Sequence, residues 1–214
     1  MNRELQTFVG GPLQTNAYLF PGKDGWICVD APQGIAAFLR EKKIRVETLL
    51  LTHGHFDHIW DAALLVSEHQ AVVYAHPADF PILHHPIGYQ KYGIPGKCPP
   101  LEKLTPLPLP PHGLVRWGCS GHEFILYHIP GHCPGSVAYY EPRCARLFDG
   151  DILFAGGVGR WDIPGGSRQD LLQGIRRYLL PLPPQTKVFP GHGRPTTIGS
   201  ERETNPFLRE EEGI

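Results

Sequence analysis

Four potential metal ligands lie within six consecutive residues, and they constrain this chain more than any other feature. They follow the apolar run 48–51, which is typical of a buried strand, in the sequence Thr-His-Gly-His-Phe-Asp-His over residues 52–58. Gly54 is expected to let the chain turn sharply, so that the ligands converge at the carboxyl end of the strand. Imidazole and carboxylate at this density are typical ligands of borderline divalent metal ions. The sequence therefore predicts a strand that ends in a metal site, with the ligands His53, His55, Asp57 and His58.

Three further candidate ligands each follow an apolar run at a glycine-containing turn. Their surroundings are Ile-Pro-Gly-His-Cys-Pro-Gly-Ser, Phe-Asp-Gly-Asp-Ile-Leu-Phe and Phe-Pro-Gly-His-Gly, and the ligands are His132, Asp151 and His192. Unrelated loops with solvated histidines are the alternative, and they explain one such motif better than they explain all of them together. Two metal ions about 3.5–4 Å apart need six or seven donors and a bridging anion. Asp151 is the expected bridge because a carboxylate has two oxygens to share.

Composition limits the class of protein. At 214 residues the chain is expected to form a single domain, with a first half over about 1–103, a second half over about 112–214 and a stiff proline-rich crossing at 105–111. The net charge is -1, so there is no excess of basic residues to indicate binding to nucleic acid or to an anionic membrane surface. The five cysteines form no Cys-x-x-Cys pair, and no stretch has the length of a membrane span, so we expect free thiols and a cytoplasmic protein.

Short strands and amphipathic helices alternate along the chain. The predicted strands are 17–20, 26–29, 48–51, 72–75, 124–127, 137–140, 146–148 and 187–189. The predicted helices are 35–43, 59–69 with Leu64 and Leu65 facing inward, 77–84, 168–180 and 201–211. Strands cluster in two blocks, each with helices, which predicts a layered α/β fold.

These motifs, in this order, resemble the metallo-β-lactamase superfamily of hydrolases over nearly the whole chain. Three more stretches, Val-Asp-Ala-Pro at 29–32, Gly-Arg-Trp-Asp-Ile-Pro-Gly-Gly at 159–166 and Thr-Thr-Ile-Gly-Ser-Glu-Arg at 196–202, look most like short bacterial proteins related to glyoxalase II. The resemblance implies a four-layer αββα sandwich with the metal site at one edge between the sheets. It also implies a first metal at His53, His55 and His132, and a second at Asp57, His58 and His192. The metals would be two divalent ions per chain, zinc first, with iron and manganese as alternatives.

The resemblance implies a metal-dependent hydrolase of a small-molecule thioester, similar to hydroxyacylglutathione hydrolase, in which a metal-bridging hydroxide attacks the carbonyl. Asp57 is either a ligand, a catalytic group that accepts a proton from that hydroxide, or both. Asp151 stands where metallo-β-lactamases proper usually carry Cys or Ser. The alternatives are a persulfide dioxygenase-like oxidoreductase with one iron at His53, His132 and Asp151, a lactonase, and a non-catalytic metal-binding module. An open, carboxylate-bridged site argues against the last, because structural zinc sites are usually closed.

Substrate contacts are less strongly specified by the sequence. Arg160 is expected either to hold a substrate carboxylate or to pair with Asp162 in a structural turn. Tyr89 and Lys91 belong to a non-periodic insertion over 84–95, which predicts a lid, a packing segment or a dimer contact. Cys133 is either a redox-sensitive neighbour of the metal or a small buried residue. Full-length glyoxalase II continues into a helical domain that this sequence does not reach, so we expect less dependence on glutathione.

The remaining histidines lie outside any ligand spacing and are expected to be exposed or hydrogen-bonded. They are His69, His76, His112, His122 and His128.

Overall fold

The structure is a computed structural model that describes residues 4–87, 90 and 93–209. The chain forms two compact units, the first over Met1–Leu107 and Cys119–His122, the second over Pro108–Gly118 and Glu123–Ile214. The boundary after Leu107 falls within the proline-rich crossing. That the two units make one domain stays a prediction.

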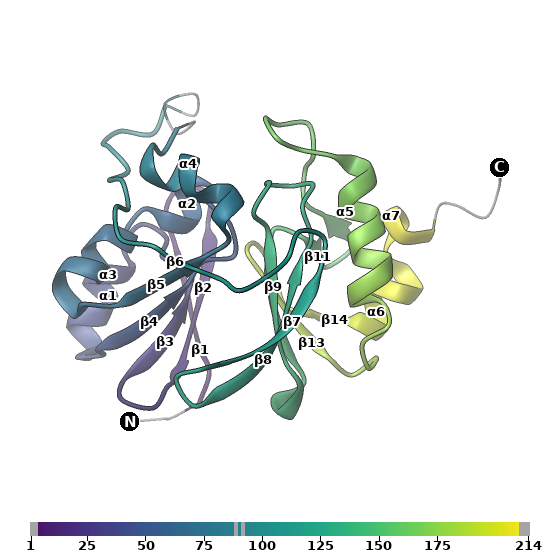
Figure 1. Cartoon of the computed structure of the whole chain (residues 1–214), viewed down its shortest axis with the longest axis horizontal. Helices are drawn as coiled ribbons and strands as arrows, with labels where there is room; N and C mark the ends of the chain where they lie inside the picture. Colours follow the sequence, from purple (N-terminus) through teal and green to yellow (C-terminus); the bar gives the residue numbers. More distant parts are fainter. Residues whose placement is uncertain (1–3, 88–89, 91–92, 210–214) are drawn as a thin grey trace. The chain divides into compact units, whose positions relative to one another are not determined.

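The first unit contains a six-stranded sheet in the order β1-β2-β3-β4-β5-β6. Its strands are β1 (Gln6–Gly10), β2 (Thr15–Pro21), β3 (Trp26–Val29), β4 (Val46–Leu50), β5 (Val72–Ala75) and β6 (Thr105–Pro106). Strands β1 to β3 pair antiparallel and β3 to β6 pair parallel. Helices α1 (Ile35–Lys42) and α3 (Ala62–His69) lie against one face of this sheet (Figure 1). Leu39 of α1, Leu49 of β4 and Leu65 of α3 share one buried apolar core.

The helix expected over 59–69 is wrong in detail, because it is two helices, α2 (Phe56–Ile59) and α3. Asp61 interrupts it with a backbone at φ -97° and ψ 5°, and its Oδ2 accepts hydrogen bonds from the N–H groups of Gly34 and Ala36 at 2.9 and 3.0 Å. This carboxylate thereby satisfies two of the backbone donors at the N-terminus of α1. Leu65 is buried as expected, whereas Leu64 is 39% exposed, contrary to prediction.

The helix expected over 77–84 consists of a 3-10 turn, η1 (Pro77–Asp79), followed by α4 (Phe80–His84). The break has a simple cause. Pro81 lies in the first turn of α4 and has no N–H with which to continue the preceding turn.

The second unit contains a six-stranded sheet in the order β14-β13-β10-β9-β8-β7 and a small hairpin of β11 with β12. Its strands are β7 (Leu114–Cys119), β8 (His122–His128), β9 (Val137–Glu141), β10 (Arg146–Gly150), β11 (Leu153–Phe154), β12 (Gly157–Val158), β13 (Lys187–Pro190) and β14 (Thr196–Thr197). A 3-10 turn, η3 (Pro142–Cys144), joins β9 to β10. Strands β10 and β13 pair parallel, whereas β8, β9 and β10 pair antiparallel in turn.

The helices of the second unit differ from expectation at their ends. The segment 168–180 is α5 (Arg168–Gly174) continued by a π-helical turn, η4 (Ile175–Leu179). The last helix begins earlier than expected, as α6 (Ile198–Thr204) capped by the hydroxyl of Thr197, and a break at Asn205 precedes α7 (Pro206–Arg209). Figure 1 shows α5 and α6 beside the second sheet. Residues 210 and 211 of the predicted helix lie outside the described part.

Candidate ligands follow the ends of four strands. In the first unit, His53 comes three residues after the end of β4. In the second unit, His132 follows β8, Asp151 directly follows β10, and His192 comes two residues after β13. Each unit therefore presents its own ligand group at strand ends, as the sequence predicts. Within the described residues, none of the helices is long and apolar enough to cross a membrane.

Candidate metal centre

The first ligand group occupies the turn between β4 and α2. The rings of His53 and His58 are both buried, with centroids 4.1 Å apart, and the rings of His53 and His55 lie 4.7 Å apart and perpendicular. Asp57 and His58 lie in the short helix α2. The structure therefore brings together all four ligands predicted from residues 52–58.

Gly54 has a different role from the one expected. It is not among the residues with positive φ, so the turn does not need glycine for its backbone conformation. A Cβ at this position would instead lie 2.6 Å from the side chain of Ile82. Its N–H donates to Oδ2 of the buried Asp79 at 2.8 Å. Glycine therefore leaves room here for the Ile82 side chain of α4.

A buried carboxylate, Asp30, orients two of the imidazoles. It accepts hydrogen bonds from the N–H of Thr52 at 2.8 Å, from the hydroxyl of Thr52 at 2.7 Å and from Nδ1 of His58 at 2.8 Å. The Thr52 hydroxyl, having donated to Asp30, accepts from Nδ1 of His53 at 3.1 Å. Both imidazoles thus carry their proton on Nδ1, which leaves Nε2 as the nitrogen that could bind a metal ion.

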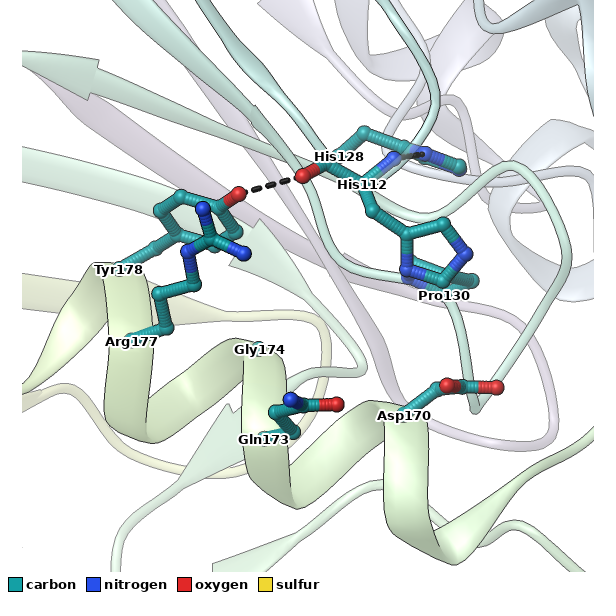
Figure 2. Close-up of a pocket in the computed structure, with 8 residues that line it drawn as sticks. All are labelled: His112, His128, Pro130, Asp170, Gln173, Gly174, Arg177 and Tyr178. Atoms are coloured by element: carbon teal, nitrogen blue, oxygen red, sulfur yellow. Dashed lines mark hydrogen bonds between the residues drawn. The ribbon is translucent and has the colours of Figure 1, made fainter.

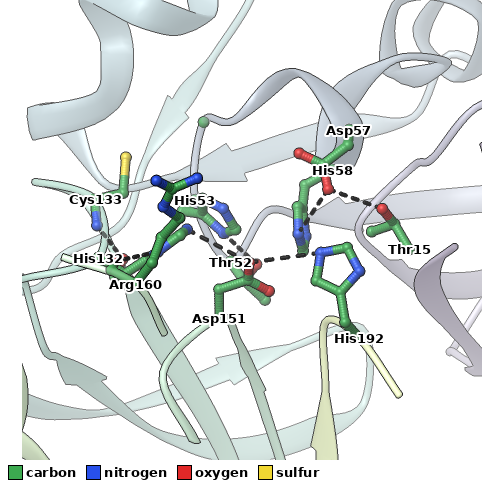
Figure 3. Close-up of polar contacts among 12 residues, drawn as sticks. Thr15, Thr52, His53, Asp57, His58, His132, Cys133, Asp151, Arg160 and His192 are labelled. Atoms are coloured by element: carbon green, nitrogen blue, oxygen red, sulfur yellow. Dashed lines mark hydrogen bonds and ion pairs between the residues drawn. The ribbon is translucent and has the colours of Figure 1, made fainter. Parts of the chain in front are cut away.

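Asp57 is held from β2. The hydroxyl of Thr15 donates to its Oδ2 at 2.8 Å, and the same oxygen lies 3.4 Å from Nε2 of His58 (Figure 3). Sequence reasoning missed Thr15 and Asp79 because nothing in their local sequence distinguishes them, and it assigned no role to Thr52 although this residue begins the ligand motif. Asp30 did have a signal, the Val-Asp-Ala-Pro stretch, but no role followed from it.

The second ligand group centres on Asp151. Its Oδ2 lies 3.5 Å from Nε2 of His132 and 3.5 Å from Nε2 of His192 (Figure 3). Nδ1 of His132 donates to the carbonyl oxygen of Arg160 at 2.8 Å, so Nε2 is again the nitrogen that faces the carboxylate. A carboxylate between two imidazoles is the arrangement expected of a bridging ligand.

Two glycines allow this second group to assemble. Gly131 has φ +128°, and a Cβ there would lie 2.5 Å from the N and 2.6 Å from the Cβ of Leu171 in α5. Gly159 approaches the backbone of Asp151 so closely that a Cβ would collide with its carbonyl oxygen. The turns that carry His132 and Asp151 therefore depend on tight backbone packing.

These spacings fit divalent metal ions. Bonds of about 2.0–2.2 Å in tetrahedral geometry separate adjacent donor atoms by about 3.3–3.6 Å. The three nitrogen–oxygen separations are 3.4, 3.5 and 3.5 Å, too long for good hydrogen bonds and suited to ligands that share an ion. Mixed imidazole and carboxylate donors suit zinc, iron and manganese.

Of the residues predicted to contact substrate, the structure describes Arg160 but not Tyr89 or Lys91. Arg160 donates from Nε and Nη2 to the two carboxylate oxygens of Asp162, both at 2.9 Å, which is the structural-turn alternative. Tyr89 and Lys91 lie outside the described residues. Cys133 is fully buried and its N–H donates to the hydroxyl of Ser136, as a small packing residue would.

The second unit also contains an open pocket of about 280 Å³ (Figure 2). Its lining residues are His112, His128, Pro130, Asp170, Gln173, Gly174, Arg177 and Tyr178. Burial lowers the pKa of His128, whose Nδ1 accepts from the N–H of His112 and whose Nε2 donates to the carbonyl of Pro134. His128 thus serves as a neutral brace beneath the loop that carries His132.

Three other histidines also have hydrogen-bonding roles, as expected. The rings of His69 and His76 accept from the N–H groups of Val46 and Ala78, and the ring of His122 donates to the carbonyl of Pro21.

The family follows from comparison with known proteins. The model of the metallo-β-lactamase superfamily matches residues 10–192, which include all seven candidate ligands, so the chain belongs to this superfamily. The α/β class and the metallo-β-lactamase fold predicted from the sequence are confirmed. Membership makes the chain a metal-binding protein of a hydrolase family.

One curated protein and two solved structures are similar to this chain over most of its length. The hydroxyacylglutathione hydrolase GloC of Haemophilus influenzae is 34% identical, over 79% of each chain. The crystal structure of TTHA1623 in a di-iron-bound form is 40% identical with a TM-score of 0.83, and covers 95% of this chain and 100% of its own. The structure of the B3 metallo-β-lactamase BLEG-1 is 34% identical with a TM-score of 0.85, and covers 96% of this chain and 100% of its own.

Proposed function

We propose that this protein is a metal-dependent thioesterase that hydrolyses small S-lactoyl-type thioesters, similar to hydroxyacylglutathione hydrolase. The observation that carries the proposal is the Asp151 carboxylate, with one oxygen 3.5 Å from each of two imidazole nitrogens. That arrangement is suited to a bridged pair of metal ions, and the named activity of GloC supports a thioester substrate.

The proposed centre uses all seven candidate ligands. His53, His55 and His132 would hold one ion, Asp57, His58 and His192 the other, and Asp151 both. Zinc is our first choice, and the di-iron form of TTHA1623 supports iron as its competitor. When bound, such ions lower the pKa of a coordinated water towards about 7 and polarise a carbonyl oxygen.

The chain's own residues supply orientation and proton acceptance. Asp30 and the carbonyl of Arg160 accept hydrogen bonds from Nδ1 of His58 and of His132, so that Nε2 of each would be available to an ion. The Asp57 carboxylate would accept the proton that the attacking water loses. Bidentate pairing of Arg160 with Asp162 leaves the guanidinium as a structural element in this conformation. The substrate partner is a small molecule, and the cytoplasm is the expected location, in keeping with five free cysteines.

The test is to assay one S-lactoyl group on glutathione and on two unrelated thiol carriers, with metal-reconstituted protein. We expect hydrolysis of the thioester by wild type and by Asp170→Asn, and strong loss in Asp151→Asn. Asp170 is a matched control because it is an aspartate of the same unit outside the ligand group.

Other outcomes identify competing functions. Oxygen uptake on a persulfide with a single bound iron, and no thioester turnover, would replace the proposal with the dioxygenase. Hydrolysis of a β-lactam or a lactone in preference to every thioester would also overturn it, and the likeness to BLEG-1 makes the β-lactam assay necessary.

A further inference from the structure

Thr15 is far from the ligand motif in sequence and lies at the start of β2, opposite Gly10 of β1. Its side chain is fully buried, and its hydroxyl donates to Oδ2 of Asp57 at 2.8 Å across 42 residues of sequence. A carboxylate can only accept, so the direction of this hydrogen bond is fixed. A β-branched side chain in a strand has little rotamer freedom, so the hydroxyl is held in place before any ligand binds.

The oxygen that Thr15 contacts is the one that faces the metal-binding nitrogen of a neighbouring ligand. Oδ2 of Asp57 lies 3.4 Å from Nε2 of His58, and Asp30 holds the proton of that imidazole on Nδ1. A carboxylate oxygen at this distance from an imidazole nitrogen is placed to share a cation with it. The Thr15 hydroxyl supplies a hydrogen-bond donor to the same oxygen and thereby fixes its position.

We propose that Thr15 is a positioning residue for the second metal ion: its hydroxyl orients Asp57, and this orientation sets the affinity of the site formed with His58. The inference rests on the metal centre of the proposed function. Removing an outer hydrogen-bond partner of a metal ligand typically lowers metal affinity about 10–100-fold. Thr15 stands outside the ligand motif and belongs to a different part of the sheet, so its loss leaves every ligand in the chain.

Three variants separate the hydroxyl from general packing. Thr15→Val keeps the shape and removes the donor, whereas Thr15→Ser keeps the donor. Thr48→Val is the matched control, because Thr48 is also buried in the first sheet and its hydroxyl shares a hydrogen bond of 2.8 Å with Ser120, away from the ligands. Circular dichroism and thermal melts establish that each variant is folded.

The measurement is titration of metal-free protein with zinc by calorimetry, and with cobalt by absorption spectroscopy. We expect two binding steps in wild type, with the weaker step reduced about 10–100-fold in Thr15→Val, a changed cobalt spectrum for that step, and recovery of both in Thr15→Ser. Thr48→Val should bind as wild type does.

Wild-type affinities in Thr15→Val would overturn the inference while leaving the proposed function intact. Equal losses in Thr15→Ser or in Thr48→Val would also overturn it, because they would show a packing effect. Failure of the wild-type protein to bind metal would overturn both proposals.

Discussion

The two ligand groups are built by different means. In the first unit, the buried side chains of Asp30, Thr52, Thr15 and Asp79 hold the ligand turn. In the second unit, the carbonyl of Arg160 orients His132, and glycines at 131 and 159 allow the turns to pack. Side-chain positioning is therefore sensitive to substitution of the partner, whereas backbone positioning is sensitive to substitution of glycine.

The sequence could predict the candidate ligands but not the residues that hold them in place. The ends of the four strands that precede the ligands were predicted within one or two residues, because apolar runs end at glycine-containing turns. All seven candidate ligands could be proposed from the sequence because each lies in a short motif, and metal binding by them stays a prediction. The residues that hold them were missed, because Thr15 and Asp79 reach the ligand turn only through tertiary contacts.

The fold was predicted less well away from the core. Strands β1 and β7 were missed because their residues alternate between exposed and half-buried and form no apolar run. The helix over 59–69 was overextended because Asp61, which interrupts it, serves as a hydrogen-bond acceptor for α1. That role depends on a segment more than 20 residues away and cannot be inferred from local periodicity.

The largest expected effect comes from removing the carboxylates of the two groups. Asp151→Ala should lower the content of both metal ions, because it removes the shared ligand. Asp57→Ala should reduce kcat by about 10²–10⁴-fold while the first ion stays bound, because it removes a proton acceptor. Metal analysis and steady-state kinetics on the same samples check both, and full metal content with full turnover in Asp151→Ala would show that the second group is wrongly assigned.

The next largest effect is expected from substituting a glycine of the second ligand group, because its turns depend on backbone packing. Gly131→Ala is expected to lower the free energy of unfolding by about 2–5 kcal/mol, because it combines a strained positive φ with overpacking against Leu171. Gly156→Ala is the control, since Gly156 also has positive φ, +77°, but has open space around it. Urea denaturation measures both, and equal losses would mean that packing of this turn contributes nothing.

A third pair of variants contrasts the two ways of orienting an imidazole. Asp30→Asn should reduce metal affinity about 10–100-fold, because an amide has one acceptor oxygen instead of two and cannot accept all three hydrogen bonds that Thr52 and His58 donate. Arg160→Ala should leave metal affinity unchanged, because the backbone carbonyl that orients His132 remains. Calorimetric titration of the metal-free variants measures both affinities. A loss of affinity in Arg160→Ala as large as that in Asp30→Asn would contradict the contrast between side-chain and backbone positioning.

The smallest expected effect is a pH dependence of stability. Burial lowers the pKa of His128 below its ordinary value of 6.5, so the unfolded chain takes up a proton more readily than the folded one. Its contribution to stability is therefore fully present above about pH 6.5 and is lost as the pH falls below that value. Urea denaturation between pH 5 and 8 should show this slope in wild type and a flatter one in His128→Gln.

His69 of the first unit provides the comparison. Its pKa is also lowered by burial, but its ring is more exposed than that of His128, so His69→Gln should flatten the slope less. An unchanged slope in His128→Gln would contradict the role of this histidine as a neutral brace.

The metal content of the purified protein tests most directly whether Asp151 bridges two metal ions. Seven ligands in two groups predict two ions per chain when zinc, iron or manganese is supplied in excess, measured by elemental analysis against protein concentration. We expect a ratio that rises to two and stays there. A ratio fixed at one with every metal would contradict a shared centre with a bridging Asp151.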